Sequence, residues 1–189
     1  MGIVSGGDAF YAEFEASRIC CLTGSLGSGK SLLAHILAER YLKQGYKLVS
    51  NMSSVWSDDL YSIKPFPNGQ YRLVVILDEG GLYVRTAKTV QKISSFARKL
   101  DTYILFSGKK LPHVDLQEVT IGEWFNFQKH LLIPLKVYKW EVDKAMGKKY
   151  SGYIWVTGWK DYYGIYSTLD PGDFPANIVK AFEAWTEEY

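Results

Sequence analysis

A short stretch near the amino terminus constrains the fold of this chain more than any other feature. An apolar run at residues 19–22 leads into a segment in which Gly24, Gly29, Lys30 and Ser31 match the pattern G-x-x-x-x-G-K-[ST]. Between a strand and a helix, this pattern is typical of a loop whose backbone N–H groups surround a polyphosphate. The positive end of the following helix also favours the anion. The stretch therefore predicts a strand, a phosphate-binding loop and a helix that together bind a nucleoside triphosphate.

The loop supplies most of the candidate ligand contacts. Lys30 is expected to reach the β- and γ-phosphate oxygens, and Ser31 is expected to hold a Mg²⁺ ion. The opposing interpretation is a glycine- and serine-rich turn that binds nothing. It is disfavoured because a Lys-Ser pair in this context has little structural use. The expected nucleotide contacts are Gly24, Ser25, Leu26, Gly27, Ser28, Gly29, Lys30, Ser31 and Leu32.

A second informative stretch covers residues 72–79, with the sequence RLVVILDE. Consecutive apolar residues are typical of a strand that is buried on both faces, so a central parallel strand is expected here. At its carboxyl end, Asp78 is expected to hold the Mg²⁺ ion with Ser31. Glu79 is expected to orient or deprotonate the attacking water. A solvated acidic turn is the alternative, and the position of the pair about fifty residues after the phosphate loop argues against it.

The order of these runs predicts an α/β fold with a mainly parallel central sheet flanked by helices. Strands that alternate with helices along the chain form sheets of this kind. The strand at 46–50 is expected to close a first β-α-β unit. The expected strands are residues 18–23, 46–50, 72–79 and 100–107, and the expected helices are residues 30–43 and 85–99.

The carboxyl-terminal third differs in texture, because aromatic and polar residues alternate there. The runs 131–142 and 150–157 predict an antiparallel β-hairpin appended to the parallel sheet. A single domain of this length is expected. Its parts are an N-terminal arm (1–17), a nucleotide-binding core (18–118), a β-rich extension (119–170) and a C-terminal helix (171–189). The arm either packs on its own domain or is lent to a neighbouring subunit.

Charge is unevenly distributed, although the net charge is only +2. Lysine and arginine concentrate in residues 85–160, whereas acidic residues predominate from residue 161 onwards. The basic middle fits either a surface for a polyanion or a solvated lysine-rich face. The lysines and aromatic residues of the hairpin likewise fit either a ribbon facing DNA or the polar outer face of a half-buried sheet.

The remaining composition indicates a soluble protein from a reducing compartment. The only cysteines, Cys20 and Cys21, are adjacent in the first expected strand, where they point to opposite faces and read as core packing. No signal peptide opens the chain, and no apolar run reaches the length of a membrane-spanning helix.

Two further residues have open interpretations. Arg98, at the end of an expected basic helix, fits either an arginine finger that reaches the γ-phosphate of a neighbouring subunit or a cation favoured at a helix C-terminus. His113 is a lone histidine in an expected loop, and a surface or packing role is favoured over a catalytic one.

The order of these elements resembles the FtsK/HerA superfamily of P-loop motor ATPases. The elements are the loop 24–31, the strand ending in Asp78-Glu79, the basic helix ending in Arg98, the strand before Gly108, and the late segment 164–170. The chain looks most like genome-packaging ATPases of tailless, membrane-containing viruses and like the amino-terminal domain of the zonula occludens toxin or filamentous-phage assembly family. The resemblance covers residues 18–175 and implies a RecA/FtsK-like P-loop fold.

The resemblance implies roles for single residues. Lys30 and Ser31 bind phosphate and Mg²⁺, Asp78 binds Mg²⁺, Glu79 is the catalytic base, and Arg98 is a trans-acting finger. Such motors usually carry a polar sensor, often Gln, at the end of the strand before Gly108, and Ser107 stands there. An arginine expected shortly after Asp115 is missing. These departures make ATP hydrolysis better supported than translocation.

The resemblance also implies the partners of the chain. They are ATP, Mg²⁺, double-stranded DNA held by its backbone, identical subunits in a ring (a hexamer or pentamer), and a capsid or virion-membrane protein. The location implied is the host cytoplasm or a capsid vertex. Genome packaging is favoured because no membrane span follows, and a toxin-like ATPase of filamentous-phage assembly is the alternative. A small-molecule P-loop kinase and a nucleotide-gated scaffold are the hypotheses from other classes.

Overall fold

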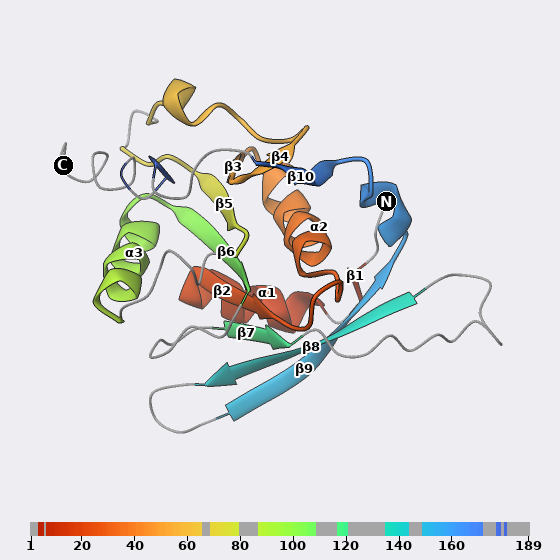
Figure 1. The fold of residues 1–189 in the computed structure, drawn as a ribbon. Helices are drawn as coiled ribbons and strands as arrows, with labels where there is room; N and C mark the ends of the chain where they lie inside the picture. The colour runs from red at the N-terminus through yellow and green to blue at the C-terminus, as the bar shows by residue number, and fades with distance from the viewer. Residues whose placement is uncertain are drawn as a thin grey trace.

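An eight-stranded sheet with helices on both of its faces forms the largest part of the structure (Figure 1). The structure is a computed structural model, and it describes residues 4–5, 7–65, 69–79, 87–108, 117–120, 135–143, 149–171, 177–178 and 180. The strand order in the sheet is β1-β9-β8-β7-β2-β6-β5-β3. A separate two-stranded ribbon consists of β4 (Met52–Ser54) and β10 (Tyr166–Pro171).

One half of the sheet is parallel. It contains β7 (Gln117–Thr120), β2 (Ile19–Thr23), β6 (Thr102–Gly108), β5 (Leu73–Leu77) and β3 (Lys47–Ser50), and each of these strands pairs in parallel with its neighbour. Every residue of β5 and of β6 is buried. Burial on both faces explains why these strands read as continuous apolar runs. The expected α/β architecture with a mainly parallel, helix-flanked sheet is confirmed.

The helices divide between the two faces of the sheet. The apolar residues of α1 (Gly7–Ser17) and α2 (Lys30–Leu42) join one core cluster, and those of α3 (Ala87–Lys99) join the other. Cys20 belongs to the first cluster and Cys21 to the second, as their alternation in β2 predicts. The segment expected to form an arm is therefore a helix that packs on its own domain. It buries Phe10, Tyr11 and Phe14 there.

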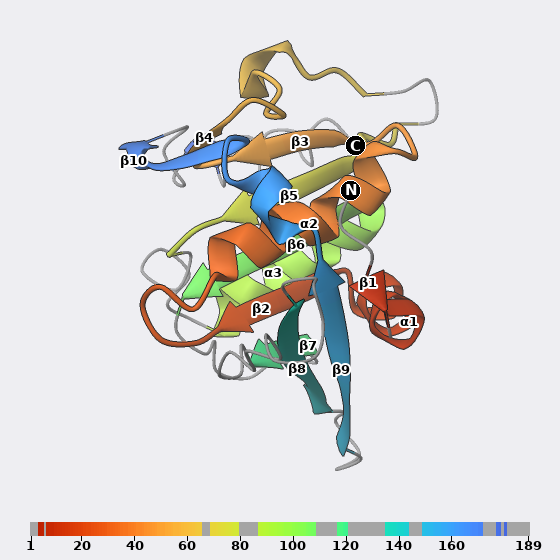
Figure 2. The same ribbon diagram turned by 90° about the vertical axis from the view of Figure 1, so that its right-hand side faces the viewer.

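The other half of the sheet is antiparallel. The hairpin strands β8 (Leu135–Asp143) and β9 (Lys149–Thr157) extend the sheet beyond β7, and β1 (Val4–Ser5) pairs with β9. Figure 2 shows β8 and β9 side by side at the end of the sheet away from β3. The predicted hairpin is therefore confirmed as strands, while its turn at 144–148 lies outside the described residues.

The strand expected to close a first β-α-β unit, β3, lies parallel to β2 in the same sheet, and β6 and β5 lie between the two strands. The segment after β4 also contributes to the core, since Leu60 and Ile63 are buried in the cluster that includes residues of α3. Of the expected C-terminal helix, Pro171 instead ends β10, residues 177–178 and 180 are helical, and the rest lies outside the described residues, as does His113. Across the described part of the chain, no helix combines the length and apolarity needed to cross a bilayer.

Candidate functional site

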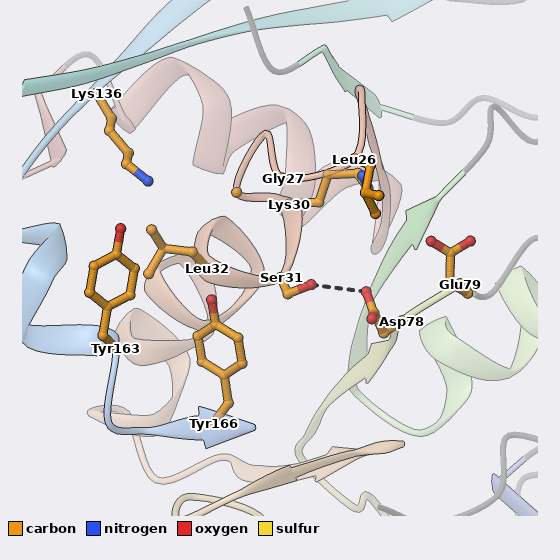
Figure 3. A pocket seen from close by; sticks show the side chains of 11 residues that line it. Leu26, Gly27, Lys30, Ser31, Leu32, Asp78, Glu79, Lys136, Tyr163 and Tyr166 are labelled. Carbon is orange, nitrogen blue, oxygen red and sulfur yellow. Dashed lines mark hydrogen bonds between the residues drawn. The ribbon is translucent and has the colours of Figure 1, made fainter. Parts of the chain in front are cut away.

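A cleft of about 560 Å³ opens at the carboxyl ends of the parallel strands (Figure 3). Ligand sites in open α/β sheets lie at this edge, and volumes of 300–1,000 Å³ are usual for small-molecule pockets. Side chains from the glycine-rich loop, β5, β8 and the segment before β10 meet here. The lining residues are Leu26, Gly27, Gly29, Lys30, Ser31, Leu32, Asp78, Glu79, Lys136, Tyr163 and Tyr166.

The glycine-rich loop presents the uncapped amino end of α2 to this cleft. Gly29 is the N-cap residue and, with Gly27, has a positive φ (91° and 75°), a conformation that favours glycine. Because Gly29 has no side chain to cap the helix, the first N–H groups of α2 lack the partner that a serine or aspartate would provide. Such a helix end is suited to an anion.

Lys30 lies folded against its own loop. Its Nζ donates hydrogen bonds to the backbone oxygens of Gly24 (3.2 Å) and Ser25 (3.0 Å). The ammonium group is therefore held beside the loop at a position from which it reaches the cleft that it lines. A phosphate in the loop would compete with these two carbonyl groups for the Lys30 ammonium.

Asp78 is held by neighbours from three other elements. Its Oδ1 accepts hydrogen bonds from the hydroxyl of Ser31 (3.1 Å) and from the hydroxyl of Ser107 at the end of β6. The side chain of Asn51, just after β3, accepts from the Asp78 N–H (2.6 Å) and donates to the Asp78 carbonyl (2.9 Å). The carboxylate is thereby fixed next to Ser31, the residue with which it was expected to share a metal ion.

Glu79 differs from its neighbour because its side chain is exposed. It follows β5 with a φ of 51°, which is uncommon for a residue other than glycine. A Cβ added to Gly108 would lie 3.3 Å from Oε2 of Glu79, so the glutamate rests against the end of β6. Figure 3 shows its carboxylate beyond Asp78, at the far side of the cleft from Lys136.

The opposite wall of the cleft comes from the antiparallel part of the chain. Lys136 on β8 is 4% exposed, and its Nζ lies 4.1 Å from the centre of the Trp159 ring and 5.9 Å from that of Tyr163. Burial lowers the pKa of Lys136 to about 8. A Cβ added to Gly29 would lie 3.4 Å from both Lys136 Nζ and Tyr138 Oη. Strand β8 therefore lies directly against the glycine-rich loop.

His35, one turn further along α2, contacts the first turn of the same helix. Its Nδ1 lies 2.8 Å from the backbone oxygen of Ser31, and its ring stacks on Tyr166 at 4.4 Å. Burial lowers the pKa of His35 to about 4, so its imidazole is neutral at physiological pH. With Nδ1 as the protonated nitrogen, the ring donates to Ser31 and holds the turn that carries the Ser31 hydroxyl.

Arg98 is far from this cleft. It is exposed in the last turn of α3, and the carbonyl group of Leu100, two residues later, accepts hydrogen bonds from the N–H groups of Tyr71 and Arg72, just before β5. The end of α3 therefore lies at the amino edge of the sheet, whereas the cleft lies at the carboxyl edge. Within one chain, Arg98 does not approach the residues that line the cleft.

Some lining residues were not anticipated from the sequence. Lys136 comes from the expected hairpin, and Tyr163 and Tyr166 come from the rest of the expected β-rich extension. One signal was present: Lys136 shares its alternation with Tyr138, Trp140 and Val142, which are buried. A lysine in the inward register of a strand indicates a special environment.

The donor set fits Mg²⁺ with a nucleotide. The described residues contain no cluster of three or more His, Cys, Asp or Glu side chains that would hold a metal ion unaided. One carboxylate and one hydroxyl, completed by substrate oxygens and water, is the arrangement that Mg²⁺ adopts with phosphates.

Scans against models of protein families and against curated proteins find no match to this chain.

Proposed function

We propose that this chain is a Mg²⁺-dependent ATPase, and that it acts as a motor that moves double-stranded DNA during viral genome packaging. The observation that carries the ATPase part is the hydrogen bond between Ser31 and Asp78, 47 positions apart in the sequence, at the mouth of an uncapped helix. The motor part rests on the resemblance to FtsK/HerA ATPases and on the P-loop fold that it implies.

Four side chains of the cleft have roles in the proposed reaction. The N–H groups at the start of α2 and the Lys30 ammonium bind the phosphate chain, which requires Lys30 to leave the carbonyl groups of Gly24 and Ser25. Ser31 and Asp78 would hold a Mg²⁺ ion, which would supply neutralisation of phosphate charge. Glu79, an exposed carboxylate next to Asp78, orients the attacking water and accepts its proton.

Ser107 has a second interpretation besides the sensor role. It is buried, and its hydroxyl is directed at Asp78. In the proposed enzyme it therefore positions the carboxylate that holds Mg²⁺. Arg98 acts only in trans, because its place at the amino edge keeps it away from the cleft of its own chain.

The test is the rate of phosphate release from ATP, with and without double-stranded DNA, for the wild-type protein and for Glu79→Gln. The substitution keeps the size of the side chain and removes its ability to take a proton. We expect hydrolysis that is stimulated by DNA in the wild type and is reduced by at least about a hundredfold in Glu79→Gln, with ATP binding retained. ATP binding is measured in parallel by calorimetry.

Other outcomes would identify the competing functions. Phosphate transfer that requires a small metabolite would favour a kinase. Tight binding of ATP without turnover would favour a nucleotide-gated scaffold. Absence of ATP binding in the presence of Mg²⁺ would refute every function that depends on this cleft.

A further inference from the structure

The cleft has two chemically different ends. Asp78 and Glu79 form an acidic end beside Ser31, whereas Lys136 and Tyr163 form a basic and aromatic end on the other side of the loop (Figure 3). A nucleoside triphosphate bound with Mg²⁺ is asymmetric in a matching way. Its metal-bound terminal phosphates attract carboxylates through the ion, and its nucleobase end offers an aromatic face.

The side chain of Lys136 is held in place by packing contacts. Lys136 is 4% exposed as a residue, and its ammonium group lines the cleft, packs against the Trp159 ring and lies next to Gly29 of the glycine-rich loop. A buried ammonium group is costly unless it has a function or compensating contacts. Burial lowers the pKa of Lys136 to about 8, so an anion in the cleft would favour its charged form.

A second group of β8 points to a ligand at the same place. Tyr138 is 1% exposed, and its hydroxyl has no hydrogen-bond partner among the described residues. Its Oη lies as close to Gly29 as Lys136 Nζ does. A buried hydroxyl without a partner is unfavourable, and an oxygen acceptor held by the loop would satisfy it.

We propose that the basic and aromatic end of the cleft binds the ribose-proximal part of the nucleotide: Lys136 contacts the α-phosphate and Tyr163 packs on the nucleobase. This inference rests on the proposed nucleotide site and deepens it. The acidic end determines where the γ-phosphate lies, so the phosphate nearest the ribose lies toward β8. Tyr163 is 56% exposed as a residue, which leaves room for a base beside its ring.

The test compares two ligands on matched variants. ATP carries phosphates and a base, whereas tripolyphosphate carries only phosphates. Lys136→Met keeps an unbranched side chain against Trp159 and removes the charge. Lys139→Met is the control, because Lys139 lies on the same strand, is partly exposed and pairs with Glu141 on the other face. Tyr163→Ala removes the aromatic ring alone.

The expected changes in dissociation constant, measured by calorimetry with Mg²⁺, are specific to each variant. Lys136→Met weakens both ATP and tripolyphosphate by about 10–100-fold, the usual effect of one charge-assisted hydrogen bond. Tyr163→Ala weakens ATP by about tenfold and leaves tripolyphosphate unchanged. Lys139→Met changes neither. If Lys136→Met binds ATP as tightly as the wild type does, the inference is overturned while the proposed nucleotide site stands.

A labelling experiment on the wild-type protein removes dependence on the folding of any variant. Acetic anhydride modifies lysines in their uncharged form, and peptide mass spectrometry reports the extent at Lys136 and Lys139. We expect ATP and tripolyphosphate each to protect Lys136 and not Lys139. Equal labelling of Lys136 with and without saturating ATP would overturn the inference. Failure of the wild-type protein to bind ATP would overturn the proposed function, and this inference with it.

Discussion

Replacement of Lys136 by methionine should stabilise the protein at neutral pH. Lys136 is 4% exposed as a residue in the native structure, and burial lowers the pKa of its ammonium group from 10.5 to about 8. Below pH 8 the lysine is charged in both the native and the unfolded state, so the native state carries the full cost of burying the charge. Lys136→Met removes that cost from the native state. It also removes the positive charge that, in our proposal, binds the nucleotide phosphate.

The magnitude follows from the pKa difference. Each pKa unit corresponds to about 1.4 kcal/mol, so the shift of Lys136 represents a cost on the order of 3 kcal/mol at most. The contact of its ammonium with the Trp159 ring offsets about 0.5–2 kcal/mol of this cost and is lost in the variant. The net expected gain in the free energy of unfolding is therefore about 1–2 kcal/mol at pH 7.

The stability difference between Lys136→Met and the wild type depends on pH. Between pH 8 and 10.5 the unfolded state binds more protons at this residue than the native state does, so the wild type gains stability as pH rises through that window. Urea unfolding, followed by tryptophan fluorescence at pH 7 and pH 10, measures the difference between Lys136→Met and the wild type. The gain should be present at pH 7 and mostly lost at pH 10.

Lys139→Met is the control for effects of charge removal in general. Its ammonium group is on the exposed face of β8 beside Glu141, so its replacement should change stability little at either pH. A Lys136→Met protein that is less stable than the wild type at pH 7 would refute the reasoning. So would a stability gain that is equally large at both pH values.

Two further substitutions test the architecture around the cleft. Asn51→Ala removes both hydrogen bonds to the Asp78 backbone, so it should lower the free energy of unfolding by about 1–3 kcal/mol. Calorimetry should show ATP binding weakened by about tenfold in Mg²⁺ and by less in EDTA. An equal loss of affinity in Mg²⁺ and in EDTA would show that Asn51 does not act through the metal site. Gly152→Ala places a Cβ about 2.6 Å from the Trp140 ring and should lower the free energy of unfolding in urea by about 1–3 kcal/mol. Gly164→Ala is the control, because a Cβ added there meets nothing within 4 Å, and it should be nearly neutral. Equal stabilities of the two variants would contradict the packing of the hairpin.

The sequence predicted those parts of the fold that depend on local patterns. The run 73–77 forms β5 and is buried at every position, and α2 begins at Lys30, where the glycine-rich loop ends. Glycine conformation, helix initiation and continuous apolar runs are properties of neighbouring residues, so they are readable without knowledge of the fold.

Features that depend on long-range pairing were not predictable in the same way. The sequence does not encode locally that β5 and β6 lie between β2 and β3, nor that β8 continues the sheet next to β7. The contact of Lys136 with Gly29 follows from that second pairing, because β7 joins β8 to β2, the strand that leads into the loop. The sequence pattern marks Lys136 as a lysine in the inward register of its strand, but it does not show that this strand lines the cleft.

The cleft combines a preformed part with a part that must rearrange. Asp78 is already fixed by Ser31, Ser107 and Asn51, so holding it for a metal ion requires little additional ordering. Lys30 must instead give up two hydrogen bonds to its own loop before it can bind a phosphate. Because these bonds are replaced only when phosphate is present, the position of the Lys30 ammonium depends on the ligand, whereas that of Asp78 does not. In the proposed enzyme, the loop and not the acidic strand end is then the element that changes between the empty and the nucleotide-bound state.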